Sequence, residues 1–257
     1  MSEMAPPPGR FVLCDLWTPD LEAAKRFYLA LFPAWQLAPE SDPQGFHHRI
    51  TMGDRSIGGV VTVDPRTCTT PRWVPYFTVK DVDATCEAVK EQGGAVHRPP
   101  AEIPHVGRFA AAADPQGASF SLIALAQEPP EHSGPMPAGA FCWLELLTTS
   151  TAAAATFYPA VLGWAHAEVP MGASPYHLFR RGERDAAGMA PAPPDAQDPP
   201  GWLAYVYTSD MDASLARVTD LGGRISRSAT HVPGVGHFAV VADPLGGKLA
   251  LFRSERG

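Results

Sequence analysis

Residues 11–32 read FVLCDLWTPDLEAAKRFYLALF, and residues 141–162 read FCWLELLTTSTAAAATFYPAVL. Both stretches begin with a β-rich segment and continue through a threonine into a helical pattern that carries a Phe-Tyr pair. The two stretches match at a spacing of 130 residues. An internal match of this length indicates a duplicated chain, so the fold has to be read from the repeated half.

The correspondence continues to the end of the chain, with one residue fewer between matching positions. The matched pairs include histidines, glycines and the aspartates of two Asp-Pro-x-Gly turns: His48 and His177, Gly59 and Gly188, Gly94 and Gly223, and Asp114 and Asp243. A stretch rich in proline separates the two halves. We therefore predict a first domain at residues 10–126, a linker at 127–138 and a second domain at 139–254.

A fainter repeat lies inside each half. Asp20 and Asp81 each follow a β-rich segment and open a helical pattern with apolar residues three and four positions apart. Short β-rich segments with turn residues follow each helix. The sequence predicts an α+β fold of four βαβββ units, in which helices cover one face of two curved sheets and the other faces form two cups.

Composition excludes several classes of protein. The 257 residues are 45% hydrophobic and 18% charged, which is typical of neither a disordered chain nor a coiled coil. The net charge of −7 argues against nucleic-acid binding. The chain contains neither an apolar run of the roughly 18–20 residues that span a membrane nor an apolar signal segment at its start. Four cysteines without CxxC spacing (Cys14, Cys68, Cys86 and Cys142) suit a reduced compartment. We predict a cytoplasmic monomer or homodimer whose partner is a small molecule.

The repeated features resemble the vicinal oxygen chelate superfamily, which includes glyoxalase I, bleomycin and fosfomycin resistance proteins and extradiol dioxygenases. The resemblance is carried by the segment from Asp20 to Trp35, by Phe157-Tyr158, and by the turns that start at Asp114 and Asp243. It covers nearly the whole chain and implies tandem glyoxalase-like domains. The tandem arrangement is similar to glyoxalase-like antigens and antibiotic-pathway proteins of actinobacteria.

Activity in this superfamily usually depends on a divalent metal ion held by histidine and glutamate inside each cup. The resemblance places those ligands on the opening strand, on the strand before the second helix and on the last strand of each half. The residues at these places are Leu13, Val74 and Ser121 in the first half and Trp143, Leu203 and Ala250 in the second. None offers an imidazole or a carboxylate, so we predict no metal and no cofactor. A relocated site built from His48, His177, His237 and Glu145 is the alternative.

Strand alternation singles out two acids as catalytic candidates. Cys14 and Leu16 form an apolar face of the opening strand, which turns Asp15 to the opposite, concave side, and the same parity turns Glu145 inward. An acid among tryptophan and leucine side chains suits a general acid or base. The alternative is an acid at the solvated end of the strand, hydrogen-bonded to a backbone amide or an arginine.

Other residues are predicted to contact a ligand in the cups. Six of them alternate inward on the predicted strands: Leu13, Trp17, Tyr76, Trp143, Tyr205 and Tyr207. Four more are polar or charged: His48, His177, His237 and Lys248. For the histidines the alternative is a structural role, and for Lys248 it is an exposed ammonium on an apolar stem.

Three functions follow from these observations. The first is a metal-independent protein that binds a small hydrophobic or aromatic metabolite, with sequestration or resistance as one form. The second is a cofactor-free isomerase, cyclase or lyase of secondary metabolism that uses Asp15 and Glu145 as acid and base. The third is a metal-dependent lyase or dioxygenase with relocated ligands.

Overall fold

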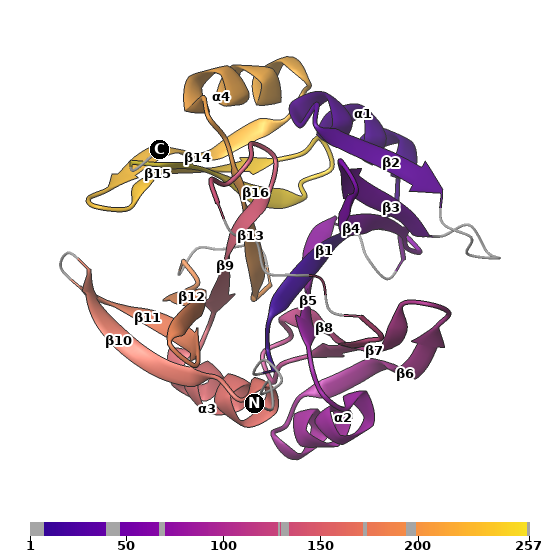
Figure 1. Ribbon diagram of the computed structural model, residues 1–257. Coiled ribbons are helices and arrows are strands. Elements are labelled where there is room, and N and C mark those ends of the chain that lie inside the picture. The colour runs from indigo at the N-terminus through magenta and orange to yellow at the C-terminus, as the bar shows by residue number, and fades with distance from the viewer. Residues whose placement is uncertain are drawn as a thin grey trace. The chain divides into compact units, whose positions relative to one another are not determined.

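A computed structural model describes residues 8–39, 47–66, 70–127, 129, 134–171, 174–193 and 199–255 (Figure 1). Parts of the predicted linker and Cys68 lie outside these residues. None of the helices in the described ranges is both long enough and apolar enough to cross a membrane.

The first half of the chain contains two helices and eight strands: β1 (Phe11–Thr18), α1 (Leu21–Leu31), β2 (Trp35–Pro39), β3 (His47–Met52), β4 (Arg55–Thr62), β5 (Arg72–Thr78), α2 (Val82–Glu91), β6 (Ala95–Ile103), β7 (Gly107–Ala113) and β8 (Ser119–Leu125). The second half repeats the order: β9 (Phe141–Thr148), α3 (Thr151–Leu162), β10 (Ala165–Met171), β11 (Ser174–Arg181), β12 (Arg184–Pro191), β13 (Gly201–Tyr207), α4 (Met211–Asp220), β14 (Arg224–Val232), β15 (Gly236–Ala242) and β16 (Lys248–Ser254). These counts refer to the described residues.

The strands form two curved eight-stranded sheets, one from each half. The order is β2-β3-β4-β1-β5-β8-β7-β6 in the first sheet and β10-β11-β12-β9-β13-β16-β15-β14 in the second. Each quarter of the chain is a strand, a helix and three further strands. This confirms the predicted α+β fold of four βαβββ units.

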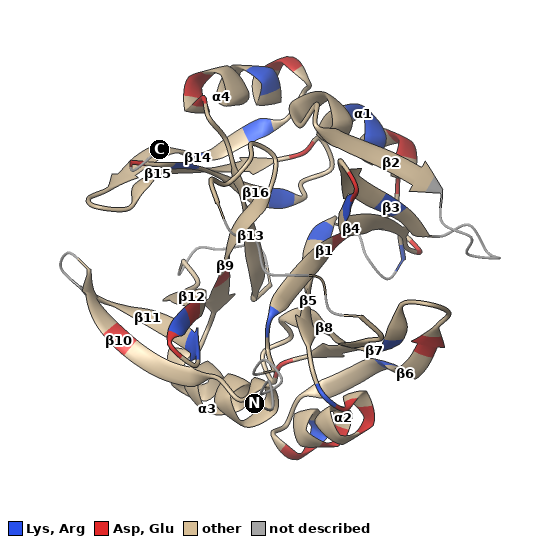
Figure 2. Cartoon of the chain, viewed as in Figure 1, with Lys and Arg blue, Asp and Glu red and all other residues tan. Residues whose placement is uncertain are grey.

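The helices begin where the sequence supplies a side-chain acceptor for the first free backbone amides. Asp20 Oδ1 accepts a hydrogen bond from the Ala23 amide at 2.8 Å, and Asp81 Oδ1 accepts one from the Ala84 amide at 3.0 Å. Acidic and basic residues are interspersed on α2 and α4, as expected of helix surfaces that face water (Figure 2).

Two compact units arise from the four quarters, and each unit contains one quarter from each half. The first unit comprises residues 1–12, 75–131 and 144–202, and in it α2 contacts α3. The second unit comprises residues 13–74, 132–143 and 203–257, and in it α1 contacts α4 (Figure 1). The contacts inside each unit therefore join residues that are far apart in the sequence.

The repeated Phe-Tyr pairs make these contacts. In the second unit Tyr28 on α1 donates a buried hydrogen bond of 2.9 Å from its hydroxyl to Asp243 Oδ2 in the last Asp-Pro turn. Phe27, the preceding residue, packs on Gly223, where a Cβ would come within 2.7 Å of the phenylalanine ring. The motif residues that match between the halves therefore hold two quarters together.

The first unit repeats this arrangement. Tyr158 on α3 donates a hydrogen bond of 3.2 Å to Asp114 Oδ2, and Phe157 packs on Gly94. Tyr158 also packs against the Trp202 ring, with 5.3 Å between the ring centroids. Because these aromatic side chains are almost fully buried, they supply much of the apolar area that stabilises each unit.

Burial raises the pKa of Asp114 and of Asp243, since the low-polarity surroundings disfavour the carboxylate more than the hydrogen bonds favour it. A carboxyl group whose pKa is raised by folding stabilises the folded state fully below its unfolded pKa of 3.8, and that contribution is lost as the pH rises through the folded pKa. We therefore predict that acidification favours the native protein over the variant with Asp114→Asn and Asp243→Asn. Urea unfolding at neutral pH and below pH 3.8 measures the free energy of unfolding of both proteins. If acidification stabilises the variant relative to the native protein, the prediction is contradicted.

Candidate functional site

The opening strand β1 separates an apolar face from an acidic one. Cys14 and Leu16 are fully buried, whereas Asp15 points to the other face and is only 2% exposed. Asp15 Oδ1 has no hydrogen-bond partner among the described residues, although it is buried. A buried carboxylate oxygen without a partner is costly to the fold, which makes Asp15 a candidate for a functional role.

His47 on β3 is the neighbour of this carboxylate. Its Nε2 atom lies 3.5 Å from Asp15 Oδ2, and the imidazole is 29% exposed. Gly59 stands in register with Asp15 on the intervening strand β4. A Cβ at Gly59 would collide with His47 Nε2 and lie 3.0 Å from Asp15 Oδ1. The glycine therefore leaves the space through which the imidazole reaches the acid.

The second half builds a related pair from different side chains. Tyr176 on β11 donates a hydrogen bond of 2.7 Å to Glu145 Oε1 on β9. Gly188 on β12 lies in register with Glu145, as Gly59 does with Asp15. In the repeat, Tyr176 occupies the position of His47. Each half thus places an acid on its opening strand and a proton-bearing side chain two strands away.

The faces of the sheets can be assigned from the packing of the helices. In the second half Phe179 on β11 packs against Tyr158 of α3, with 5.4 Å between the ring centroids. In the first half Trp35 on β2 stacks on Tyr28 of α1. We call the face that carries Phe179 or Trp35 the helix-covered face, and the face that carries Asp15 or Glu145 the helix-free face.

The structure corrects the predicted placement of two histidines. His177 lies two residues from Phe179 on β11 and therefore on the same face of that strand. On β3, His48 likewise lies two residues from the buried Ile50. Its partner across the sheet is Val60, which also pairs with Leu16 on the apolar face of β1. Both histidines are therefore on the helix-covered face and do not contact Asp15 or Glu145. Since His177 and Glu145 lie on opposite faces, they cannot share the relocated metal ion that the sequence left open.

His237 also departs from its predicted place. It shares the face of β15 with Ala239 and Val241, which are fully buried, and it lies at the exposed start of the strand, 4.7 Å from the His231 ring. Phe238 occupies the other face, where its ring is 5.9 Å from that of Tyr205. His237 therefore does not lie beside Tyr205, the tyrosine that was predicted to contact a ligand.

The remaining predicted contacts lie on strand positions of the parity that the sequence indicated. Trp17 shares the helix-free face of β1 with Leu13 and Asp15, and Trp143 shares that of β9 with Glu145. Both tryptophans are partly exposed. Tyr76 and Tyr205 are nearly buried and stand in register with Ser121 and Ala250, respectively. Tyr207 and Lys248 are partly exposed. Their contact with a ligand stays a prediction.

The residues at the expected metal-ligand positions do not fit a divalent cation. Ala250 and Ser121 are fully buried, and Ser121 Oγ, the one oxygen among the six side chains, has no hydrogen-bond partner in the described ranges. Leu13, Val74, Trp143 and Leu203 offer no ligand atom. A single neutral hydroxyl does not replace the imidazole and carboxylate ligands that such an ion needs.

The described cysteines have the properties of buried structural residues. Burial raises the pKa of the Cys142 thiol to about 12. The pKa of Cys14 is also raised, first by burial and then by the neighbouring Asp15 carboxylate. A thiol that resists ionisation is a poor nucleophile and a poor metal ligand, so Cys14 and Cys142 are not candidate site residues.

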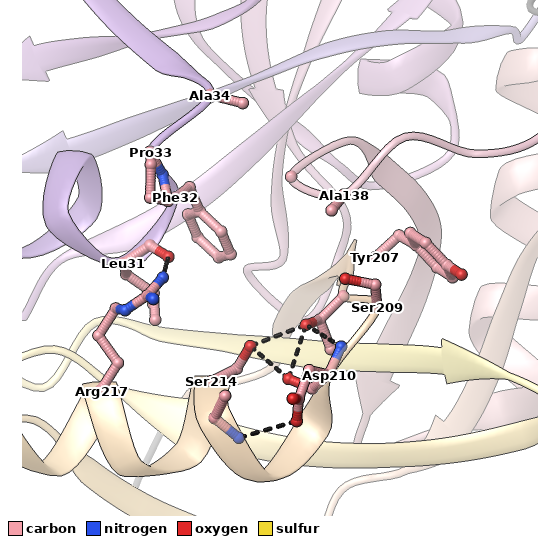
Figure 3. Close-up of a pocket in the computed structure, with 13 residues that line it drawn as sticks. Leu31, Phe32, Pro33, Ala34, Ala138, Tyr207, Ser209, Asp210, Ser214 and Arg217 are labelled. Carbon is pink, nitrogen blue, oxygen red and sulfur yellow. Dashed lines mark hydrogen bonds between the residues drawn. The ribbon is translucent and has the colours of Figure 1, made fainter.

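A small pocket of about 220 Å³ opens in the second unit between the end of α1, the segment at Gly139 and the start of α4 (Figure 3). Several of its polar groups are hydrogen-bonded within the lining. Arg217 Nη1 donates to the Leu31 carbonyl at 3.3 Å, and Ser214 Oγ donates to the Asp210 carbonyl at 2.8 Å. Of the predicted site residues, Tyr207 is the one that borders this pocket. We interpret the pocket as a packing feature.

These observations agree with the matches to known proteins. The family model of the Glyoxalase/Bleomycin resistance protein/Dioxygenase superfamily matches residues 10–122 and 141–251. The chain belongs to this superfamily. Two matched segments, one in each half, show that this member of the superfamily carries its domain in tandem, as the duplication predicted.

Two kinds of relatives share the tandem length. CFP32 of Mycobacterium bovis, which carries a glyoxylase name, is 31% identical over 93% of this chain and 92% of its own length. The anthracycline biosynthesis protein DnrV of Streptomyces peucetius is 29% identical over 97% of this chain and 95% of its own. This superfamily member therefore matches both relatives over nearly their full lengths.

Solved structures of the superfamily share the fold. The Mn(II)-bound glyoxalase from Novosphingobium aromaticivorans aligns with a TM-score of 0.67 and 16% identity, over 97% of this chain and 83% of that protein. The 2,3-dioxygenase LapB from Pseudomonas sp. KL28 aligns with a TM-score of 0.67 and 15% identity, over 97% of this chain and 94% of that protein. At this identity the likeness is one of fold.

Proposed function

We propose that this superfamily member binds a small aromatic or hydrophobic metabolite on the helix-free faces of its sheets, without a metal ion. One observation carries the proposal. On β1 and β9 the helix-free face presents a partly exposed tryptophan beside an acid, Trp17 with Asp15 and Trp143 with Glu145. Trp143 stands where the resemblance places a metal ligand. An indole ring there favours a flat apolar ligand over a cation.

The names of two relatives support an aromatic ligand. DnrV and DauV are named as anthracycline biosynthesis proteins, and anthracyclines are polycyclic aromatic compounds with ring hydroxyl and carbonyl groups. A ligand of this kind would stack on the tryptophan of one half and meet the polar pair of that half, Asp15–His47 or Glu145–Tyr176, through its oxygen atoms. We infer a role in secondary metabolism, as binder or carrier of such a compound.

A second candidate function is cofactor-free acid–base catalysis, and the Asp15–His47 pair favours it. The Asp15 carboxylate is buried, and Nε2 of the partly exposed His47 imidazole lies 3.5 Å from it, an arrangement that suits a general base. His47 would then take a proton from a metabolite bound at this pair, and Glu145 with Tyr176 would form a separate pair with a phenol donor in the second half. Such proton transfers complete an isomerisation, whereas a cyclisation also forms a bond within the metabolite and an elimination also releases a leaving group from it.

Titration of the purified chain with an anthracycline aglycone tests the proposal. We expect quenching of tryptophan fluorescence, and we expect Trp143→Ala to weaken binding about tenfold or more because an aromatic anchor is lost. Trp143→Phe keeps a ring and should bind more tightly than Trp143→Ala. Equal affinity of the native chain and of both variants would contradict the proposal.

Affinity and turnover, measured on the same variants, separate a binder from an enzyme. In a binder, Asp15→Asn and Glu145→Gln keep the affinity within a few fold. In an enzyme, one of them lowers turnover of the compound extracted from the native chain by about 10²-fold or more. Mass spectrometry of that extract supplies the compound and its product.

A further inference from the structure

Three side chains on the β10–β11 hairpin are arranged as metal ligands outside the site described above. His166 and Glu168 alternate on β10, so both point to the same face, and His177 on β11 stands directly opposite Glu168. His166 Nε2 is 3.1 Å from His177 Nδ1, and His177 Nδ1 is 3.6 Å from Glu168 Oε1. All three ligand atoms lie within 4.8 Å of one another.

Two of the three distances between ligand atoms are close to those of a tetrahedral site. Zinc bonds to imidazole nitrogen and carboxylate oxygen are about 2.0–2.2 Å long, so neighbouring ligand atoms in a tetrahedron are about 3.3–3.6 Å apart. The observed nitrogen–nitrogen distance falls slightly below this range and the nitrogen–oxygen distance at its upper end. Two imidazoles and a carboxylate are a ligand set that zinc uses with a water molecule in the fourth position.

The surroundings leave that position open. His177 is 17% exposed and Glu168 is 56% exposed, so solvent reaches the carboxylate side of the cluster. On the inner side the His166 ring lies 6.0 Å from Phe179, which packs against Trp164.

The first half of the chain supplies a natural comparison. The positions equivalent to His166, Glu168 and His177 are Leu37, Pro39 and His48, and the register of β2 and β3 is the same: Pro39 stands opposite His48. One ligand of three is present there. The cluster on β10 and β11 is therefore a property of the second half and does not follow from the repeated fold.

We propose that His166, Glu168 and His177 bind one divalent transition-metal ion of the zinc class on the helix-covered face of the second sheet. The ion fastens the edge strand β10 to β11. It lies on the opposite face from Glu145 and Tyr176, so it is separate from the proposed ligand-binding face and compatible with metal-independent function there.

The test uses the full-length chain without a histidine tag, treated with a chelator and dialysed. Calorimetric titration with Zn²⁺ should show one ion per chain, and Zn²⁺ should raise the melting temperature. Co²⁺ in place of Zn²⁺ should give the strong visible absorption of a tetrahedral site.

Variants locate the ion. His177→Ala should weaken Zn²⁺ binding by about 100-fold or more, since even residues behind metal ligands contribute 10–100-fold. Glu168→Gln should weaken it less and remove the tetrahedral Co²⁺ spectrum. His48→Ala, the equivalent change in the first half, should leave Zn²⁺ affinity unchanged.

Three results would overturn the proposal: no Zn²⁺ binding by the native chain, native affinity in His177→Ala, or loss of binding in His48→Ala alone. None depends on turnover or on the metabolite, so failure of the metal site and failure of the proposed function can be told apart.

Discussion

Neither half of this chain is expected to fold as a monomer when it is expressed without the other. Residues 10–126 contain α1 and α2, whose partners α4 and α3 belong to the second half. A separate first half would lose the buried Tyr28–Asp243 hydrogen bond and expose Phe27 and Tyr28, which are 2% and 3% exposed in the whole chain. Each such aromatic side chain buries about 150–250 Å², so the exposed patch would favour association or unfolding.

The measurement is size-exclusion chromatography with near-ultraviolet circular dichroism. We expect each half alone to aggregate, unfold or dimerise, and we expect the two halves mixed during refolding to form a one-to-one complex with the spectrum of the whole chain. The control is the whole chain cut in the linker after folding, which should stay assembled. A monomeric half with fixed aromatic packing would contradict this reading of the compact units.

Gly223→Ala is expected to lower the free energy of unfolding by about 1–3 kcal/mol, the usual cost of overpacking a closely fitted contact. A Cβ at this position would lie 2.7 Å from the Ala242 carbonyl oxygen and 2.7 Å from the Phe27 ring. Neither neighbour yields easily, because one is backbone in β15 and the other is held in the helix α1. Gly94→Ala should act similarly through the Ala113 carbonyl and Phe157.

Urea unfolding measures the change, and Gly201→Ala is the matched control. A Cβ at Gly201 would meet its nearest atom, the Pro199 carbonyl oxygen, at 3.8 Å, which is ordinary contact. Its stability should therefore change by no more than about 0.5 kcal/mol. Equal stability losses in Gly223→Ala and Gly201→Ala would show that backbone freedom, and not the Phe27 contact, explains the requirement for glycine.

The architecture was predictable because its determinants are local. Asp20 and Asp81 begin helices with their own side chains, and the Asp-Pro-x-Gly turns lie in both halves at matching positions. The pairing of the quarters was not predictable. It depends on contacts such as Tyr28 with Asp243, which join residues in different halves, and the repeat alone allows each quarter two partners.

The candidate site was predictable in part. Alternation placed Asp15 and Glu145 opposite the buried residues of β1 and β9 because both strands pair regularly with their neighbours. Because both halves have a histidine at matching positions, His48 and His177, the sequence suggested these two residues as neighbours of the acids, and they are not. Ile50 on β3 and Phe179 on β11 are buried on the helix-covered face. Strand alternation counted from them turns His47 and Tyr176 to the opposite face, where they meet the two acids.

The hairpin cluster needed information that the sequence does not hold. His166 and Glu168 are two residues apart, but the nearest loop separates them from His177, and a shift of one residue in the pairing would turn His177 to the other face. The equivalent residues Leu37 and Pro39 gave no hint from the repeat.

The exchange of His47 for Tyr176 makes the two halves chemically unequal partners. An imidazole can both take up and release a proton near neutral pH, whereas a phenol acts chiefly as a donor. The acid differs as well, Asp15 in the first half and Glu145 in the second, so the two copies present an imidazole beside one carboxylate and a phenol hydrogen-bonded to the other.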